Sequence, residues 1–413
     1  IANLTGAAPD VVMIETKTPV VKSCWQWVDR LKERMPATRF ALVGDHVTAL
    51  PRESMEKSRA DYVLTGGDYD FLLLGLLNHL ASGSPLESGI WHRKDGRIGN
   101  TGEFACKHDL RTLPWIDRDL TRWKLYSVMN GNFKRVPGTY IMSGRDCWHG
   151  KCSFCSWTTL YPNYRTREPD DVLDEIGDLI ERYGVREIMD DTGTFPVGDW
   201  LRAFCRGMIE RGYDRRINFD CNMRFGRLGF EDYKLMKEAG FRFILFGLES
   251  ANQATLDRLQ KGIRVEDIAE GASAAARAGL DVHVTVMFGY PWEGPDEIAR
   301  TVALARRLLI EGLSYTLQVT LVIPYPGTPL FKEMETSGAR ATNDWDAFDL
   351  RMNVMKGKVS EEDIKKAIRE VYRAFLHPRA LWHRLAHTRH PLDDLQFYWR
   401  GLRSLVGHLH DFR

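Results

Sequence analysis

The first 80 residues alternate between short apolar runs and helical stretches. Apolar runs at 11–14, 40–43 and 61–64 have the length of buried β-strands. An amphipathic helix is predicted near residues 21–34, and a more apolar helix follows the third run. The leucines of that second helix are Leu72, Leu73, Leu76 and Leu77. Strand–loop–helix units in series predict a parallel, Rossmann-like sheet of the α/β class, whose ligand binds beyond the carboxyl ends of the strands.

The alternation becomes more regular after residue 138. A helix predicted at 169–183 opens with Asp170 and Asp171, where the helix dipole favours negative charge. Six stretches with strand character lie at 139–142, 187–189, 218–220, 243–246, 282–287 and 317–322. Six strand–helix units of this kind predict a barrel or a partial (β/α)6 barrel.

The segments outside these two regions are predicted to be a linker and a tail. Residues 82–138 are punctuated by glycine without helical periodicity, which is typical of a linker. Ser360 and Asp363 resemble a helix cap, and the residues after them place apolar side chains on one helical face. Those side chains are Ile364, Ile368, Val371 and Phe375. The predicted domains are therefore 1–81, the linker 82–138, the barrel 139–335 and a helical region 336–413.

The residues beyond Pro378 are rich in arginine, tryptophan and histidine. An amphipathic helical tail packed on the barrel is the favoured interpretation of this composition, and a membrane-surface or partner site is the alternative. Histidine-rich tails bind metals in some proteins, but no spacing in this tail requires it. The histidines in question are His383, His387, His390, His408 and His410.

Composition excludes several classes of protein. The chain of 413 residues is 44% hydrophobic and carries a net charge of +1, which argues against a nucleic-acid partner. Seven cysteines, an odd number, argue against a secreted disulfide framework and for the reducing cytoplasm. No apolar run approaches the ~18 residues of a membrane span, and no signal peptide is visible. The chain starts at Ile1, and three strands make a small sheet, so we expect further strands of the first domain to precede it.

Three cysteines lie within nine residues, directly after the run at 139–142. Cys147, Cys152 and Cys155 are able to bind three irons of a cubane cluster and leave the fourth iron open for a substrate or cofactor. The alternative is a zinc site of the Cys₃His type, completed by His149. Ligand softness and geometry favour the iron–sulfur interpretation.

Polar residues follow five successive predicted strands. Barrels of this kind build their active site at the carboxyl ends of the strands. Acidic, basic and hydroxyl groups in register beside the cysteine loop therefore predict one composite pocket. The residues at these ends are Asp190, Asp191, Asn222, Arg224, Glu249, Ser250, Gly289, Tyr290, Pro291 and the stretch 324–327.

Together these motifs resemble a known family. Residues 139–331 resemble the radical S-adenosylmethionine (radical SAM) enzymes, and residues 9–80 look like the latter part of their cobalamin-binding domain. The features that carry the resemblance are the three cysteines with Phe154 before the last of them, Asp190 with Asp191, and the stretches 247–250, 289–291 and 326–331. The domain order is similar to that of cobalamin-dependent methylases and of the anaerobic magnesium-protoporphyrin cyclase.

One spacing departs from the family pattern. Four residues separate Cys147 from Cys152, whereas the family has three at this place. Gly150 lies in this interval, and glycine is able to absorb an extra residue in a relaxed loop.

The resemblance implies three cofactors: a 4Fe–4S cluster, S-adenosylmethionine and cobalamin. The open iron would chelate S-adenosylmethionine, which the reduced cluster cleaves to methionine and a 5′-deoxyadenosyl radical. By the same resemblance, Asp190 or Asp191 would bind the amino group and Arg224 the carboxylate. Glu249 and Ser250 would take the ribose hydroxyls, and the backbone near Phe154 and Gly289 would take the adenine.

Further expectations concern the corrin ring and the partners. The groups expected to line the corrin and its nucleotide tail are Thr16, Thr18, Gly44, Thr48, Gly66 and Gly67. Ordinary turn glycines are the alternative for the three glycines. No Asp-x-His-x-x-Gly motif is convincing, so His46, in a predicted strand-end loop, is expected to be a wall residue of the site. An electron donor such as flavodoxin or ferredoxin is the expected protein partner.

The resemblance implies methyl transfer from methylcobalamin to an unactivated carbon of a small or lipid-like metabolite. An oxidative or cyclising reaction on the same scaffold is the alternative within the class. A non-enzymatic iron–sulfur or zinc protein is the alternative outside it. The five polar strand ends favour an enzyme, because a structural metal site does not need them.

Overall fold

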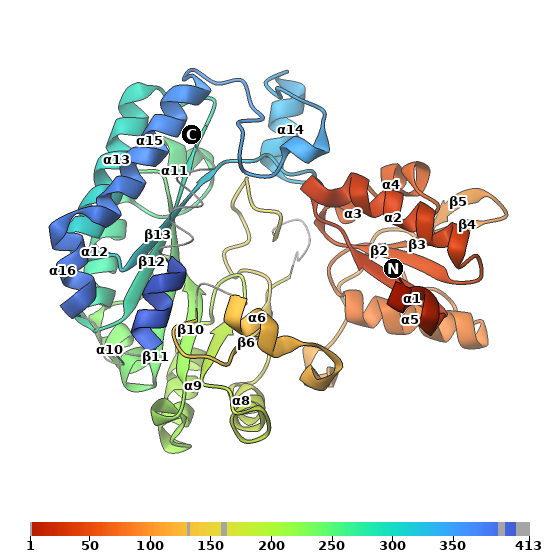
Figure 1. Cartoon of the computed structure of the whole chain (residues 1–413), viewed down its shortest axis with the longest axis horizontal. Helices are drawn as coiled ribbons and strands as arrows, with labels where there is room; N and C mark the ends of the chain where they lie inside the picture. The colour runs from red at the N-terminus through yellow and green to blue at the C-terminus, as the bar shows by residue number, and fades with distance from the viewer. Residues whose placement is uncertain (1, 130–132, 158–162, 387–392, 402–413) are drawn as a thin grey trace. The chain divides into compact units, whose positions relative to one another are not determined.

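A computed structural model describes residues 2–129, 133–157, 163–386 and 393–401 (Figure 1). The chain divides into two compact units, each described by itself below. Unit 1 consists of Ile1–Asp109, Gly150–Asn163 and Ile323–Lys356, and unit 2 of Leu110–His149, Tyr164–Val322 and Gly357–Arg413. Each unit is therefore built from three separate segments of the chain, and the limits of the units differ from the predicted limits of the domains.

Unit 1 contains a five-stranded sheet with the order β1-β2-β3-β4-β5. Strands β1 (Val11–Glu15), β2 (Arg39–Val43) and β3 (Tyr62–Leu64) pair in parallel. Strands β4 (Ile90–Lys94) and β5 (Arg97–Asn100) complete the sheet by antiparallel pairing. The three strands predicted from the apolar runs and their parallel arrangement are confirmed.

Strands β4 and β5 lie inside the stretch predicted as a linker, which was wrong for this part of the chain. They form a hairpin whose turn, Asp95-Gly96, has φ values of 50° and 74°. An Asp-Gly pair adopts the two positive φ angles of a tight hairpin turn, so this dipeptide was the signal in the sequence. The predicted linker also contains α6 (Trp123–Met129), which belongs to unit 2.

The two helices predicted in unit 1 are confirmed as α2 (Val21–Arg34) and α5 (Tyr69–Ser82), and one predicted loop is corrected. The prediction placed Asp45 and His46 in a strand-end loop, but they begin the helix α3 directly after Gly44. Helix α2 buries residues at helical spacing, among them Val21, Trp25 and Val28. The helical elements are α1 (Ala2–Ala7), η1 (Thr18–Val20), α2 (Val21–Arg34), α3 (Asp45–Ala49), α4 (Pro51–Lys57), α5 (Tyr69–Ser82), α14 (Pro329–Thr336) and η5 (Trp345–Ala347).

Unit 2 contains a six-stranded sheet in which every pairing is parallel. Its order is β13-β12-β11-β10-β9-β6, so the strands follow one another across the sheet in chain order. All six predicted strands are confirmed, and their carboxyl ends share one edge. The strands are β6 (Gly138–Ile141), β9 (Glu187–Asp190), β10 (Asn218–Met223), β11 (Phe241–Glu249), β12 (Asp281–Phe288) and β13 (Thr316–Leu321). Two short strands, β7 (Gly144–Arg145) and β8 (Arg165–Thr166), pair separately.

One hydrophobic core joins this sheet to its helices, which Figure 1 shows along the outer side of the strands. In it the rings of Phe204 on α9 and Phe219 on β10 lie 5.0 Å apart, and Phe219 lies 4.9 Å from Phe241 on β11. The helices in this core are α8 (Pro169–Tyr183), α9 (Asp199–Glu210), α10 (Phe230–Glu238), α11 (Gln253–Arg258), α12 (Val265–Arg277), α13 (Pro295–Ile310) and α15 (Glu361–Arg373), and α16 (Pro378–Ala386) also belongs to unit 2. Helix α8 matches its predicted range.

The predicted amphipathic helix near residue 360 is confirmed as α15. Asp363 donates its backbone N–H to the Ser360 hydroxyl at 3.1 Å, which caps the helix. Ile364, Ile368 and Val371 are buried in the core that also holds the six strands. His387, His390, His408 and His410 lie outside the described residues. Within the described ranges, no helix is both long and apolar enough to cross a lipid bilayer.

Candidate functional site

The two aspartates that end β9 have different environments. Asp190 is fully buried and accepts hydrogen bonds from the backbone N–H groups of Ser143 at 2.7 Å and of Thr192 at 3.0 Å. Burial raises the pKa of its carboxyl to about 6. Asp191 has an exposed side chain. Asp190 therefore fixes the chain that leads into the cysteine loop, and Asp191 is the member of the pair that faces solvent.

The first part of the cysteine loop, residues 147–149, is hydrogen-bonded to loops that follow the strands of unit 2. The thiol of Cys147 lies 2.9 Å from the hydroxyl of Thr194, beyond β9. Trp148 donates its indole N–H to the carbonyl of Phe195 at 3.2 Å. His149 donates Nε2–H to the carbonyl of Gln260 at 2.7 Å, so at least one of its ring nitrogens has a protein partner. These bonds hold Trp148 and His149, two of the four residues between Cys147 and Cys152, in place.

The second part of the loop belongs to unit 1, because the division of the chain falls between His149 and Gly150. Cys155 donates its backbone N–H to the carbonyl of Cys152 at 3.2 Å, which makes a tight turn around the half-buried Phe154. Leu330, at the start of α14, donates its N–H to the carbonyl of Ser153 at 2.8 Å. The sequence stretch 326–331 thus supports the cysteine loop.

All seven cysteines lie within the described residues and are thiols rather than disulfides. Cys205 and Cys221 lie in the hydrophobic core, where burial raises the pKa of the Cys205 thiol to about 12 and that of Cys221 far above its usual value. In the part of the chain that the structure describes, no group of three His, Cys, Asp or Glu side chains stands ready to hold a metal ion. The three-thiol site therefore stays a prediction, which rests on the chemistry of the loop's donors.

A buried ion pair lies at the end of β11. The Nζ atom of Lys261 is 2.6 Å from Oε1 of Glu249, and both side chains are more than nine-tenths buried. The guanidinium of Arg224, which follows β10, donates to the carbonyl of Lys261 and stacks 5.5 Å from the ring centroid of Trp148. The structure thereby brings the predicted residues Arg224 and Glu249 together with the loop that carries Cys147.

The backbone at Glu249 is unusual. Its φ angle of 63° lies in the left-handed region, which costs a residue with a side chain on the order of 1–3 kcal/mol. The pairing of β11 with β12 shifts register between Gly247 and Glu249, so that Leu248 forms a β-bulge. Bulges of this kind re-aim a side chain beside an active site. The bulge and the left-handed residue together direct the carboxylate of Glu249 towards Lys261.

Gly247 packs closely against the same ion pair. A Cβ atom at this position would lie 2.1 Å from Oε1 of Glu249 and 2.6 Å from Nζ of Lys261. The ion pair therefore occupies the space above the glycine. Lys261 was missed in the sequence because it lies twelve residues from its partner and in no recognisable motif.

Two further predicted residues lie near the ends of β11 and β12. Ser250 is fully buried, and its hydroxyl donates to Oε1 of Glu293 at 2.7 Å. This hydroxyl is therefore engaged inside the protein. Gly289 follows β12 directly and has a φ angle of 94°, a conformation that favours glycine.

The residues predicted to line a corrin lie at the carboxyl ends of β1, β2 and β3. Thr16 is buried and donates its hydroxyl to the carbonyl of Val43 at 2.7 Å. A Cβ atom on Gly44 would lie 2.3 Å from the carbonyl oxygen of Thr16, so close packing requires this glycine. The hydroxyl of Thr48 accepts the N–H of Gly66 at 3.3 Å. The first three strand ends are thus joined by backbone and hydroxyl groups.

Packing also accounts for Gly66, since a Cβ atom there would overlap the ring of Phe104. Gly67 has a φ angle of 92°. The hydroxyl of Thr18 lies 3.3 Å from Nδ1 of His46. His46 is fully buried, its Nε2 is 3.3 Å from a carboxylate oxygen of Glu53, and burial lowers its pKa. A ring held on both nitrogens does not fit a cobalt ligand.

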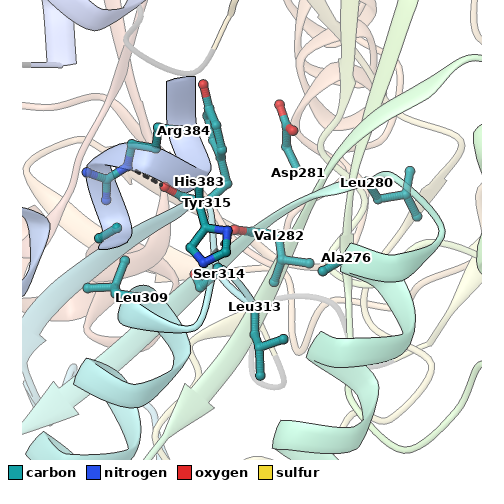
Figure 2. Close-up of a pocket in the computed structure, with 12 residues that line it drawn as sticks. Ala276, Leu280, Asp281, Val282, Leu309, Leu313, Ser314, Tyr315, His383 and Arg384 are labelled. Atoms are coloured by element: carbon teal, nitrogen blue, oxygen red, sulfur yellow. Dashed lines mark hydrogen bonds between the residues drawn. The ribbon is translucent and has the colours of Figure 1, made fainter. Parts of the chain in front are cut away.

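A small cavity lies at the opposite, amino-terminal ends of β12 and β13 (Figure 2). Asp281, Ser314 and His383 are among its lining residues, and Arg384 donates Nε–H to the carbonyl of Tyr315 at 3.2 Å. Its volume of about 20 Å³ has room for one water molecule. This cavity is too small for a substrate.

Comparison with known proteins defines the class. Residues 141–305 match the family model of the Radical SAM superfamily, and this range contains the cysteine loop, Arg224 and the Lys261–Glu249 pair. The chain therefore contains a radical SAM domain, and such a domain implies an enzyme with a 4Fe–4S cluster and S-adenosylmethionine as cofactors. The alternative of a non-enzymatic iron–sulfur or zinc protein is not retained.

Three individual proteins illustrate what the chain is similar to. The chain is 26% identical to an uncharacterized methyltransferase of Pyrococcus horikoshii over 90% of its own length and 80% of the relative. It is 24% identical to the anaerobic magnesium-protoporphyrin IX monomethyl ester cyclase of Cereibacter sphaeroides, over 98% of this chain and 64% of that protein. Its fold is similar to that of the cobalamin-dependent S-adenosylmethionine radical enzyme OxsB, solved with aqua-cobalamin and S-adenosylmethionine bound. That match has a TM-score of 0.69 at 12% identity and covers 99% of this chain and 64% of OxsB.

Proposed function

We propose that the chain is a cobalamin-dependent radical SAM enzyme that methylates an unactivated carbon of a small or lipid-like metabolite. The observation that carries the proposal is the set of contacts at the carboxyl ends of β9, β10 and β11. There Cys147, Arg224 and the Lys261–Glu249 pair lie on loops that bond to one another. Similarity to a methyltransferase over most of its length supports the type of reaction.

The cysteine loop fits a cluster by the chemistry of its donors. Cys147, Cys152 and Cys155 are thiols on one loop, whereas Cys205 lies in the hydrophobic core of unit 2. We assign these three thiolates as the iron ligands. When bound, the cluster supplies an open iron and the electron for reductive cleavage of S-adenosylmethionine. We also propose that flavodoxin or ferredoxin provides this electron in the cytoplasm, where free thiols persist.

The site residues suit the polar groups of S-adenosylmethionine. Lys261 holds the carboxylate of Glu249 in place by an ion pair of 2.6 Å, and a carboxylate held in this way is a suitable acceptor for ribose hydroxyl groups. Arg224 is a cation of fixed orientation over Trp148, suited to the carboxylate of the methionine part. The exposed Asp191 is the better of the two aspartates for the amino group, since Asp190 is engaged by Ser143 and Thr192. Phe154 and Gly289 remain the proposed contacts of the adenine.

Unit 1 is proposed as the latter part of a cobalamin-binding domain. The carboxyl ends of parallel strands β1–β3 are the place where such sheets bind ligands, and they carry Thr48, Gly66 and Gly67. These residues fit a corrinoid held by backbone and hydroxyl groups, and His46 does not take part. When bound, cobalamin supplies the methyl group for transfer. We likewise interpret the six-stranded sheet of unit 2 as a partial (β/α)6 barrel.

A second candidate is an oxidative or cyclising reaction, favoured by the similarity to the magnesium-protoporphyrin cyclase over 98% of the chain. The two candidates differ in their products. Methyl transfer consumes one S-adenosylmethionine to S-adenosylhomocysteine and a second to 5′-deoxyadenosine, whereas oxidation yields only the second nucleoside. We therefore propose incubation of the reduced protein with a metabolite extract and S-adenosylmethionine labelled in the methyl group. Labelled product with roughly equal amounts of both nucleosides supports methylation. 5′-Deoxyadenosine without S-adenosylhomocysteine supports the oxidative candidate.

A further inference from the structure

We infer that Glu293 is a positioning residue of the S-adenosylmethionine site, which sets the conformation of Glu249 through the turn that follows β11. This inference rests on the proposed function, because it takes Glu249 as a residue of that site. Glu293 comes from the loop after β12 and has no role in the function as proposed above. Its side chain is 1% exposed, so it acts from inside the protein.

A single carboxylate oxygen of Glu293 gathers three donors from one turn. Its Oε1 accepts from the hydroxyl of Ser250 at 2.7 Å, the hydroxyl of Thr255 at 2.7 Å and the amide of Asn252 at 3.1 Å. These three residues span the turn between β11 and the first residues of α11. The turn therefore has one common acceptor, which lies on another loop.

Other bonds attach the same turn to the start of α13. The backbone N–H of Ala251 donates to the hydroxyl of Thr301 at 3.0 Å. Asn252 donates to the carbonyl of Glu297 at 2.9 Å and accepts from Nε of Arg300 at 2.6 Å. The turn is therefore bonded to α13, the helix that follows Glu293 in the chain, as well as to Glu293 itself.

This attachment bears directly on Glu249, which precedes Ser250. Ser250 is held on both sides, because its N–H donates to the carbonyl of Leu248 at 2.9 Å while its hydroxyl donates to Glu293. Glu249 lies between Leu248 and Ser250, and its φ angle is 63°. Such a conformation persists only when its surroundings hold it in place. Without the acceptor on Glu293, residue 249 is free to return to an ordinary conformation, which would move its carboxylate away from Lys261.

A purely structural residue at this position would not need to be acidic. The second oxygen of Glu293, Oε2, is buried and has no hydrogen-bond partner among the described residues, which is unfavourable. Burial also raises the pKa of this carboxyl. The carboxyl group is thus retained at a cost, and its favourable contacts all go to the turn beside Glu249. That pattern indicates a role in placing the turn.

The test compares three substitutions in the full chain, anaerobically reconstituted with iron and sulfide. Glu293→Met removes the acceptor with little change of volume, and Glu293→Gln keeps an acceptor oxygen without the charge. Thr255→Val removes a single donor and remains informative if the Met variant does not fold. Leu308→Ala is the matched control, since Leu308 is fully buried in α13 and lies about two helical turns beyond Thr301. Equilibrium dialysis measures the Kd for S-adenosylmethionine, and hydrogen exchange measures the protection of peptides covering 248–256.

We expect the Kd to rise at least tenfold for Glu293→Met, about threefold for Thr255→Val and less than threefold for Glu293→Gln. Exchange in 248–256 should increase in the Met variant and not in Leu308→Ala. An unchanged Kd in a folded Met variant, or in Thr255→Val if the Met variant does not fold, overturns the inference. A Gln variant as weak as the Met variant also overturns it, because the acceptor would then not be the cause. If the unmodified protein itself does not bind S-adenosylmethionine, the proposed function fails, and this result is distinct from the others.

Discussion

Lys261 and Glu249 form an ion pair of 2.6 Å at the end of β11, with side chains that are only 9% and 7% exposed. Removing one partner leaves a buried charge without compensation, which typically costs about 3–5 kcal/mol. Lys261→Met should therefore lower the free energy of unfolding by about 3 kcal/mol and weaken binding of S-adenosylmethionine. Denaturant titration and equilibrium dialysis measure the two effects.

The double variant Lys261→Met/Glu249→Gln separates these effects. It removes both charges, so the unfolding free energy should recover by more than half relative to Lys261→Met. Binding should stay weak, since the acceptor for the ribose is no longer ionised. A double variant as unstable as the single one would show that the two residues are not energetically coupled.

A substitution at Gly247 tests whether the Lys261–Glu249 pair packs against this residue. In Gly247→Ala the new methyl group would overlap Oε1 of Glu249, so the pair must move, and overpacking of this kind costs about 1–3 kcal/mol. Gly229→Ala is the control, because no atom lies within 4 Å of the position its Cβ would take. Thermal unfolding and the Kd for S-adenosylmethionine should change in the first variant and hardly in the second. Equal behaviour of the two variants would contradict the close approach at Gly247.

The fold of this chain is largely predictable from its hydrophobic pattern. Buried strands such as β2 and β11 are rich in apolar residues, because parallel strands are covered on both faces. The hairpin β4–β5 was missed because its residues are only partly buried and give no such run. Helix α3 was missed because five residues are too few for a periodic signal. Local turn chemistry at Asp95-Gly96 would have located the hairpin.

The chemistry of the site is less predictable than the fold. Polar residues at strand ends were found, since their position in the chain follows from the strands. Their partners were not, because Lys261 and Glu293 come from loops whose course depends on tertiary packing. The sequence likewise did not distinguish Asp190 from Asp191, although one is buried and the other exposed. Burial of a polar group becomes known only from the folded chain.

The three loop cysteines should be necessary for the cluster. Replacing any one of Cys147, Cys152 and Cys155 by alanine should abolish the oxygen-sensitive absorbance of the reconstituted protein and lower its iron content. Cys205→Ala is the matched control, since its thiol lies in the core with a pKa raised by burial to about 12. Cys24, Cys106 and Cys221 should be dispensable as well. Full iron content in the triple variant would contradict the assignment of the ligands.

A corrinoid should bind to unit 1. A protein that includes any residues preceding Ile1 should retain hydroxocobalamin through gel filtration, measured by its absorbance. The pair Thr48→Val and Gly67→Val should reduce retention, because one removes a hydroxyl and the other fills the space at a strand end that needs a positive φ angle. If the unmodified protein retains no corrinoid, the methylation proposal falls and a cobalamin-independent radical reaction takes its place.

His283 should account for part of the fall in the free energy of unfolding at acid pH. It is buried in β12 beside Arg242, and its pKa is lowered by burial, and further by the cation, to about 4. The folded chain thus binds a proton less readily than the unfolded chain, whose histidines titrate near 6.5. The stabilisation is complete above pH 6.5 and is lost as the pH falls towards 4, with a total of about 3 kcal/mol.

His283→Gln cannot titrate, so its unfolding free energy should fall less steeply between pH 6.5 and 4 than that of the unmodified protein. His92→Gln, in β4 of unit 1, serves as the control and should keep the original slope. Denaturant titrations at five pH values measure the slopes. Parallel curves for the unmodified protein and His283→Gln would show that this histidine does not contribute.

The most direct test of the central claim is the formation of 5′-deoxyadenosine. The reconstituted protein is incubated without oxygen with dithionite and S-adenosylmethionine, and the nucleosides are quantified by mass spectrometry. A radical SAM enzyme whose cluster is bound by Cys147, Cys152 and Cys155 should release 5′-deoxyadenosine, and the triple alanine variant should release none. A protein with a full complement of iron that forms no 5′-deoxyadenosine, or a triple variant that forms as much as the unmodified protein, would contradict the claim.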